Sequence, residues 1–252
     1  ALGCSANATL ALSRARGIGQ LVGPWAWGMA LTAGIYISGG VSGGHLNPAV
    51  TLGMISVGKL HWKKMFHYIG AQFLGAFLGA TVTLLVYHQS LEPKELEHAS
   101  AFGTFPNNNI NTGTVVIDQI VATAFFLLLI NAITDERNMT LPKGLIPIAI
   151  GITDLGLMIY SFGYNCGAPL NPARDFSPRL LSVMAGWNTV FKENNYYFWV
   201  PLLCPIIGGV IGSWLYKLMI ELHWPQNSYD LTTAKIDESE NNSNSNKRVK
   251  PL

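Results

Sequence analysis

Two short apolar segments, each opened by an Asn-Pro-Ala triplet, constrain the fold of this chain more than any other feature. The triplets are Asn47-Pro48-Ala49 and Asn171-Pro172-Ala173, which begin 124 residues apart. Asn is a favoured N-cap and Pro is favoured at the first helical position, so a helix is predicted to begin at each triplet. Each segment has about ten residues, or about 15 Å as a helix, which is half of a bilayer's hydrocarbon core.

Five longer apolar stretches surround these segments. They lie near residues 22–42, 66–87, 114–133, 144–162 and 196–216. Each has about the twenty residues that a helix needs to cross a bilayer. Charged residues make up 12% of the chain, about half of their share in soluble proteins. The sequence therefore predicts an all-α membrane protein, in which residues 1–12 are expected to be the end of a truncated first spanning helix.

The two short segments are expected to be re-entrant half-helices. A half-length helix in lipid would leave backbone groups without hydrogen bonds, so it is stable only where it lines a cavity. One such segment falls in each half of a channel domain predicted over residues 1–222, with halves of about 1–113 and 114–222. An odd number of spanning helices per half inverts the second half relative to the first. The half-helices then enter from opposite faces and meet near the midplane.

This arrangement predicts a pore for uncharged molecules. Helix N-termini carry partial positive charge, so two of them at the pore centre repel cations and hydronium. The side-chain oxygens of Asn47 and Asn171 can cap their own helices, which leaves the amide donors free to face the pore. Those donors can hold the oxygen of a passing water and interrupt a proton wire. The predicted function is passive permeation with exclusion of ions and protons.

The sequence resembles the aquaporin family, and in particular its aquaglyceroporin branch. The resemblance is carried by GVSGGHLNPAVTLG (40–53), by NPARDFSPRL (171–180) with the AGW that follows, and by AITDERN (132–138). Asp175, directly after Arg174, is typical of glycerol-conducting members. The resemblance implies six spanning helices and two re-entrant half-helices, assembled as a homotetramer with one pore per subunit. It also implies permeation of glycerol, water and other small uncharged solutes such as urea.

The resemblance also places a selectivity filter by spacing from the motifs. Arg174 and Trp27 match the filter arginine and aromatic residue, and Ile159 and Ala168, fifteen and six residues before Arg174, match the other two corners. Arg174 offers donors and Trp27 an apolar wall, which together suit a polyol. Glycerol channels commonly have glycine and an aromatic residue where this chain has Ile159 and Ala168, a set more similar to plant nodulin-26-type channels. The expected carbonyl acceptors belong to Gly43, Gly44, His45, Gly167 and Ala168.

Four further residues carry functional hypotheses. His45 is expected to modulate the pore by protonation, and Cys166 is expected to border the outer vestibule as a mercurial site. Asp118 occupies the position of a buried family glutamate that accepts hydrogen bonds from loop backbone. Asp154 has no such counterpart, and its state is left open between protonated, paired and wetted. The alternatives are a water-selective channel, a secondary transporter that uses Asp154 or Asp118, and a non-conducting protein.

Charge and composition indicate the orientation and exclude other classes of protein. Nine Lys and Arg lie in residues 59–64, 137–143 and 235–250, against four in the intervening loops, so these two loops and the tail are predicted to be cytoplasmic. Residues 223–252 are predicted to be a disordered cytoplasmic tail, and the plasma membrane is the expected location. A net charge of +2 indicates no nucleic acid partner. Three scattered cysteines and the lack of a nucleophile-base pair or phosphate loop predict no enzyme activity, metal or cofactor.

Overall fold

The computed structural model describes residues 2–13, 21–91 and 96–224, which form a helical bundle without a strand in those ranges. Apart from residues 223 and 224, the predicted tail lies outside the described residues. The body of the bundle consists of α1 (Leu2–Ser13), α2 (Val22–Ser42), α4 (Met65–Tyr87), α6 (Thr112–Thr134), α7 (Ile146–Gly156) and α11 (Trp199–Met219). The connections contain η2 (Trp62–Lys64), α5 (Leu96–Ala99), α8 (Gly163–Cys166), α10 (Glu193–Tyr196) and η4 (Glu221–His223).

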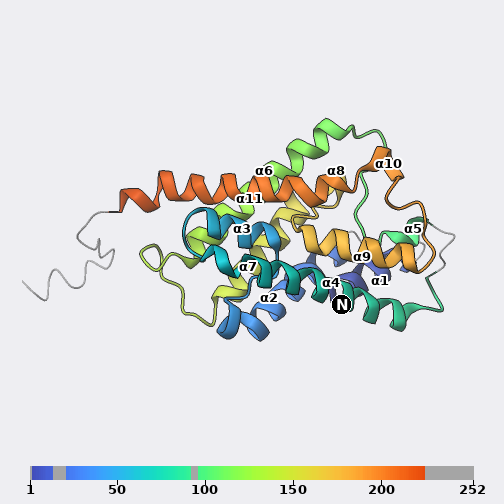
Figure 1. Ribbon diagram of the computed structural model, residues 1–252, viewed down its shortest axis with the longest axis horizontal. Helices are drawn as coiled ribbons and strands as arrows, with labels where there is room; N and C mark the ends of the chain where they lie inside the picture. The colour runs from blue at the N-terminus through green and yellow to red at the C-terminus, as the bar shows by residue number, and fades with distance from the viewer. Residues whose placement is uncertain (1, 14–20, 92–95, 225–252) are drawn as a thin grey trace, which may run out of the picture.

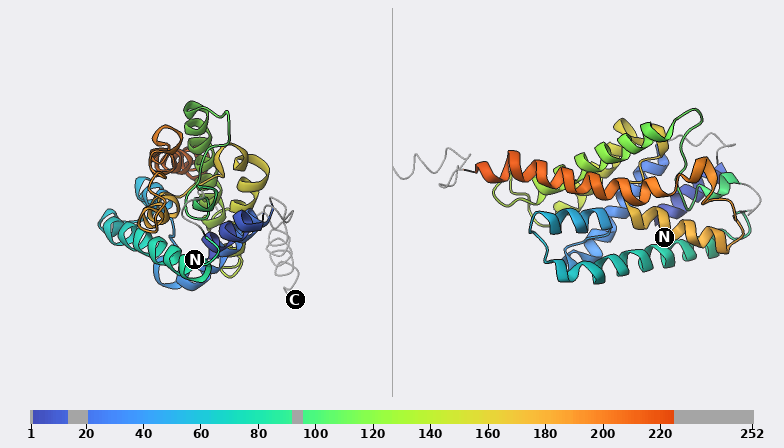
Figure 2. Two further views of the ribbon diagram at one scale, coloured as in Figure 1. Left: turned by 90° about the vertical axis from the view of Figure 1, so that its right-hand side faces the viewer. Right: turned by 45° about the horizontal axis from the view of Figure 1, so that its top comes forward.

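Two half-length helices, α3 (Pro48–Ser56) and α9 (Pro172–Met184), lie end to end between α4 and α11 (Figures 1 and 2). Both begin where the sequence predicts. Asn47 Oδ1 accepts a hydrogen bond from Ala49 N at 2.8 Å, and Asn171 Oδ1 accepts one from Ala173 N at 3.0 Å. These bonds satisfy backbone donors that have no partner inside a helix, so the Asn-Pro pair sets both helix starts.

All five predicted long stretches are helical, but one of them changes its helix type. The stretch near 144–162 is α7 followed by a π-helical turn, η3 (Leu157–Ser161), in which Phe162 N bonds to Leu157 O at 2.8 Å. By length and composition, three described helical segments can cross a membrane, namely Trp62–Tyr87, Thr112–Thr134 and Glu193–His223. The 21-residue α2 is long enough as well, although its Gly, Ser and Thr residues make it less apolar.

Glycines bring α11 and α6 into close contact. A Cβ at Gly208 would lie 2.2 Å from Ile120 O, and one at Gly212 would lie 2.0 Å from Ala124 O. Only glycine lets the two backbones approach this closely, which is how small residues act at helix crossings in membranes. Gly75 in α4 makes no such crossing within the described chain, because no atom lies within 4 Å of a Cβ placed there.

Helices α2 and α7 pack as an antiparallel pair. Gly28 contacts the backbone of Gly151, Thr32 Oγ1 donates to Pro147 O at 3.2 Å, and further along Tyr36 OH donates to Gly144 O at 2.6 Å. The residue numbers rise on α2 as they fall along the chain from Gly151 to Gly144, so the register of the pair is known over about two turns. This register fixes the position of every α7 residue along the axis of the bundle, its height, relative to the residues of α2.

Candidate solute pathway

A cavity of about 830 Å³ lies among α2, α4, α6, α7 and the two half-helices. Residues of both Asn-Pro-Ala motifs border it, because Asn47, Asn171 and Ala173 are part of its lining. The other members of the triplets, which are Pro48, Ala49 and Pro172, are buried behind that lining. The two segments that the sequence places in a common lumen therefore meet at one cavity.

The two half-helices are joined by reciprocal hydrogen bonds at their N-termini. Asn47 Nδ2 donates to Leu170 O at 2.9 Å, and Asn171 Nδ2 donates to Leu46 O at 3.0 Å. The prediction that both amide donors are free to face the pore is therefore wrong in part. Each amide has two N–H groups. One of them closes the contact between the half-helices, and the other remains for a solute.

Two glutamines hold the loops that precede the half-helices. Gln72 Nε2 donates to His45 O at 2.9 Å and to Thr51 Oγ1 at 2.8 Å. In the other half, Gln119 Oε1 accepts from Leu170 N at 3.2 Å. The first loop needs its two glycines, since Gly43 and Gly44 both have positive φ. In the second loop, Gly167, Ala168 and Leu170 also have positive φ, so two residues with side chains adopt a backbone that glycine prefers.

The expected role of Asp118 is wrong in its partners. Its carboxylate accepts hydrogen bonds from side chains, Asn165 Nδ2 at 2.7 Å and Gln119 Nε2 at 2.7 Å, and the loop backbone is bonded by Gln119 instead. Asp118 is buried outside the cavity lining, whereas Asp154 on α7 is part of it. Of the two carboxylates proposed for a coupled transporter, only Asp154 faces the cavity.

Arg174 lies over the face of Trp27 at one wall of the cavity. Its guanidinium carbon is 4.3 Å from the centroid of the ring, and its side chain is 8% exposed. The ring is held in turn by α1, because Trp27 Nε1 donates to Asn7 Oδ1 at 3.0 Å and Gly3 lies against the ring face. This stacking favours the charged guanidinium. The sequence did not indicate that α1 positions the aromatic residue.

Met158 of η3, not Ile159, borders the cavity at the end of α7. Ile150, Asp154 and Met158 are four residues apart and share one helix face that lines the cavity, while Ile159 lies about 140° around the helix from Asp154. Ile159 was predicted by counting fifteen residues back from Arg174, and this count crosses η3. One turn of η3, with its i→i−5 hydrogen bond, contains more residues than one turn of an α-helix. The filter corner at Ile159 stays a prediction, while the residue that lines the cavity at this place is Met158. The four-residue spacing could have identified Met158.

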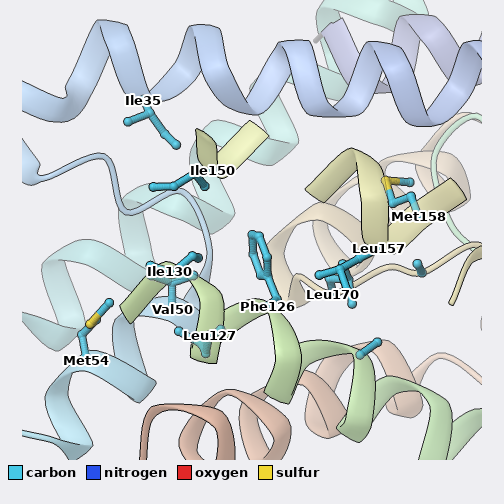
Figure 3. Close-up of a cluster of buried hydrophobic side chains, with 12 residues drawn as sticks. Ile35, Val50, Met54, Phe126, Leu127, Ile130, Ile150, Leu157, Met158 and Leu170 are labelled. Carbon is cyan, nitrogen blue, oxygen red and sulfur yellow. The ribbon is translucent and has the colours of Figure 1, made fainter. Parts of the chain in front are cut away.

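The remaining predicted positions divide between the cavity and its surroundings. Gly43, Gly44, His45 and Ala168 border the cavity, and Gly167 does not. Apolar side chains from four elements also line the cavity, and Figure 3 shows Ile35, Val50, Phe126, Ile130 and Ile150 pointing toward one another. The cavity lining thus combines polar groups, on Arg174 and the asparagines, with these apolar side chains.

Cys166 does not border the cavity. It is 1% exposed and its thiol lies 3.2 Å from Gln119 Nε2, behind the loop of the second half-helix. Cys4 borders the cavity instead, one residue from the Gly3 that packs on Trp27. The sequence argument relied on distance along the chain from Arg174, and α8 turns Cys166 away from the cavity.

We therefore expect mercurial inhibition, if present, to depend on Cys4. The Cys4→Ser variant should lose at least half of the inhibition of solute flux by a mercurial, because mercury on this thiol narrows the passage beside Trp27. Cys166→Ser should be inhibited as the unmodified protein is. Flux measured in vesicles before and after a mercurial checks this. Protection by Cys166→Ser alone would show that the cavity is reached from another side.

Comparison with known proteins places these features in a family. The family model "Major intrinsic protein" matches residues 1–216. The chain is 43% identical to human Aquaporin-9 over 235 residues, with 89% of this chain and 79% of the relative covered. It is 40% identical to human Aquaporin-10 over 227 residues, with 84% and 74% covered.

A solved structure is also similar over most of its length. It is described as the X-ray structure of the aquaglyceroporin from Plasmodium falciparum. It is 32% identical to this chain with a TM-score of 0.75, and the match covers 88% of this chain and 94% of that one.

Proposed function

Because the chain belongs to the major intrinsic protein family of integral membrane proteins, we propose that it conducts glycerol, water and other small uncharged solutes passively through a bilayer. The observation that carries the proposal is the cavity shared by Asn47, Asn171 and Arg174. Its relatives include proteins named aquaporins and one described as an aquaglyceroporin.

The lining of the cavity matches the chemistry of a polyol. A hydroxyl group that loses its hydration without a new partner costs about 2 kcal/mol or more, and glycerol has three hydroxyls. Arg174 and the remaining amide hydrogens of Asn47 and Asn171 supply donors. Ile35, Val50 and the other apolar residues of the lining contact carbon. A solute that carries both hydroxyls and carbon is accommodated better than a fully polar one.

Charge accounts for the exclusion of cations and protons. The N-termini of α3 and α9 meet at the cavity and each contributes about half a positive charge. Arg174 adds a full charge on the same path. A cation entering the cavity therefore meets repulsion from three sources, whereas a neutral solute gains hydrogen bonds from the same groups.

The most informative test is stopped-flow light scattering of proteoliposomes under gradients of water, glycerol, urea and sorbitol. We expect rapid swelling with water and glycerol, slower or equal permeation of urea, and none of sorbitol. Water flux without glycerol flux would favour the water-selective alternative. Saturable uptake coupled to an ion gradient would favour a transporter, and the absence of all flux would favour a non-conducting protein.

We also propose the assembly and orientation that the sequence indicates. Large apolar side chains such as Trp25, Leu85 and Phe125 are exposed on the outside of the single chain, so lipid or a neighbouring subunit covers them. A homotetramer in the plasma membrane with a cytoplasmic C-terminus is expected from the family resemblance and the bias of basic residues. Native mass measurement in detergent tests the subunit number, and protease access to intact cells tests the orientation.

His45 carries the prediction of pH dependence. The ring is half-buried at the cavity, with Nδ1 3.5 Å from Thr51 Oγ1 and an edge-to-face contact with Tyr68 at 5.4 Å. Protonation adds a charge there and gives both ring nitrogens a hydrogen, so glycerol flux is expected to fall by about twofold from pH 8 to pH 5. His45→Gln should abolish this change, and His67→Gln, at a second histidine of the lining, should retain it. Flux of the unmodified protein that stays flat over this range would contradict the hypothesis.

A further inference from the structure

Asp154 lies at nearly the same height in the cavity as Trp27. The antiparallel contacts of α2 and α7 place Gly151 beside Gly28. Trp27 is one residue and Asp154 three residues from this contact, both toward the same end of the bundle. At 1.5 Å per residue, their difference in height is about 3 Å. Along the axis of the bundle, Asp154 therefore lies close to the position at which Arg174 stacks on Trp27.

The carboxyl group of Asp154 is buried yet lacks a partner. The residue is 9% exposed, lines the cavity, and makes no hydrogen bond or ion pair with any residue in the described ranges. A buried carboxyl group without a partner is costly, so its position at a cavity indicates that something in the cavity completes its hydrogen bonds. Neighbouring Thr153, in contrast, points away from the cavity and bonds to Ala149 O at 2.9 Å.

Arg174 has a matching unsatisfied donor. Its Nη1 atom is buried and has no hydrogen-bond partner among the described residues, and the nearest carboxylate oxygen, on Asp175, is 3.8 Å away. Asp154 and Arg174 attract each other electrostatically, but they do not approach within the 4.0 Å of an ion pair. Nη1 is covered and lies toward Asp175, but Arg174 is part of the cavity lining, and its other side-chain N–H groups make no hydrogen bond with a described residue either. An acceptor on Asp154 and donors on Arg174 thus border one cavity without contacting each other.

A hydroxyl group is both a donor and an acceptor, so it can bridge these two residues. We propose that Asp154 and Arg174 form a solute-bridging pair, in which a polyol hydroxyl donates to the Asp154 carboxyl group and accepts from the Arg174 guanidinium. The inference rests on the proposed channel function and adds to it a specificity-determining residue on α7. Urea, which has N–H donors and a carbonyl acceptor, meets the same requirement. The pair selects solutes that carry both a hydrogen-bond donor and an acceptor. Asp154 also reduces the positive potential that Arg174 creates at a neutral solute between them.

Three variants test the pair in proteoliposomes by stopped-flow light scattering. Asp154→Leu removes the acceptor at similar size, Asp154→Asn keeps one acceptor oxygen without the charge, and Thr153→Val is the matched control on the same helix. We expect Asp154→Leu to reduce glycerol and urea permeability by about tenfold, because a solute N–H or O–H loses its acceptor beside Arg174. Water permeability should stay within about twofold of that of the unmodified protein, since a water molecule in the cavity keeps its hydrogen bonds to the neighbouring water molecules. Asp154→Asn should keep at least half of the glycerol flux, and Thr153→Val all of it.

The outcomes separate this inference from the channel function itself. If the unmodified protein conducts no glycerol, the proposed function fails before the variants are compared. If it conducts glycerol and Asp154→Leu retains the same ratio of glycerol to water permeability, the bridging pair is refuted while the channel stands. Equal losses in Asp154→Leu and Asp154→Asn would also refute it, because the amide retains an acceptor. Unchanged water flux in Asp154→Leu shows that the variant folds and inserts.

Discussion

Arg174→Val is expected to raise the conductance of cations and protons by at least tenfold. Two unit charges about 5 Å apart repel by about 3 kcal/mol at an effective dielectric constant of about 20, so removal of the guanidinium lowers the barrier to a cation substantially. The N-termini of α3 and α9 remain and limit the gain.

Proton and potassium flux into vesicles with a pH-sensitive dye measures this effect, with water permeability as the check that the channel is open. Lys143→Ala is the matched control, because it removes the same charge from an exposed loop position outside the cavity. Equal ion flux in Arg174→Val and in the unmodified protein would show that the helix N-termini alone set the barrier.

Asp175→Ala is expected to lower the melting temperature in detergent by about 10 °C. Asp175 and Arg179 form an ion pair of 2.8 Å with both residues 1% exposed, and the loss of one partner from a buried pair costs about 3–5 kcal/mol. The same carboxylate accepts hydrogen bonds from Thr104 N and Thr104 Oγ1, both at 2.7 Å. It therefore ties the segment before α6 to the half-helix α9.

Two comparisons make this prediction specific. Glu136→Gln, at an exposed acidic residue, should leave the melting temperature within about 2 °C. The double variant Asp175→Ala with Arg179→Met should lose less than Asp175→Ala alone, because no charge is then left buried without a partner. A double variant that is no more stable than the single one would show that Thr104, rather than Arg179, is the important partner.

The sequence predicted the architecture because the features that indicate it involve residues close together in the chain. The apolar lengths, the Asn-Pro caps and the equal placement of the two motifs depend on residues that are neighbours along the chain, and both half-helices begin as predicted. Trp27, Ala168 and Arg174, which the family resemblance places in the filter by their distance from the motifs, all border the cavity. In a helix of regular pitch, the number of residues between a motif and another position determines whether that position faces the cavity.

The residues predicted to line the cavity differ from the observed ones where an irregular turn of the backbone, or a contact between distant parts of the chain, changes which side chain reaches it. The π-turn η3 shifts the phase of α7, so the residue at the cavity is Met158 instead of Ile159. The turn at α8 removes Cys166 from the cavity, and packing of α1 brings Cys4 to it. Spacing rules assume an unbroken helix, and neither turn has a signature in the residues that were counted.

The sequence by itself determined that this protein is a helical membrane protein with two inverted half-helices, since apolar length and helix capping are properties of contiguous residues. Only the tertiary structure decided which polar groups meet. The opposition of Asp154 and Arg174, the contact of Asn47 with Leu170 and the support of Trp27 by Asn7 join residues that are 20, 123 and 20 positions apart. Such pairings depend on the register of packed helices, which is set by close contacts such as Gly28 on Gly151 and by no single segment.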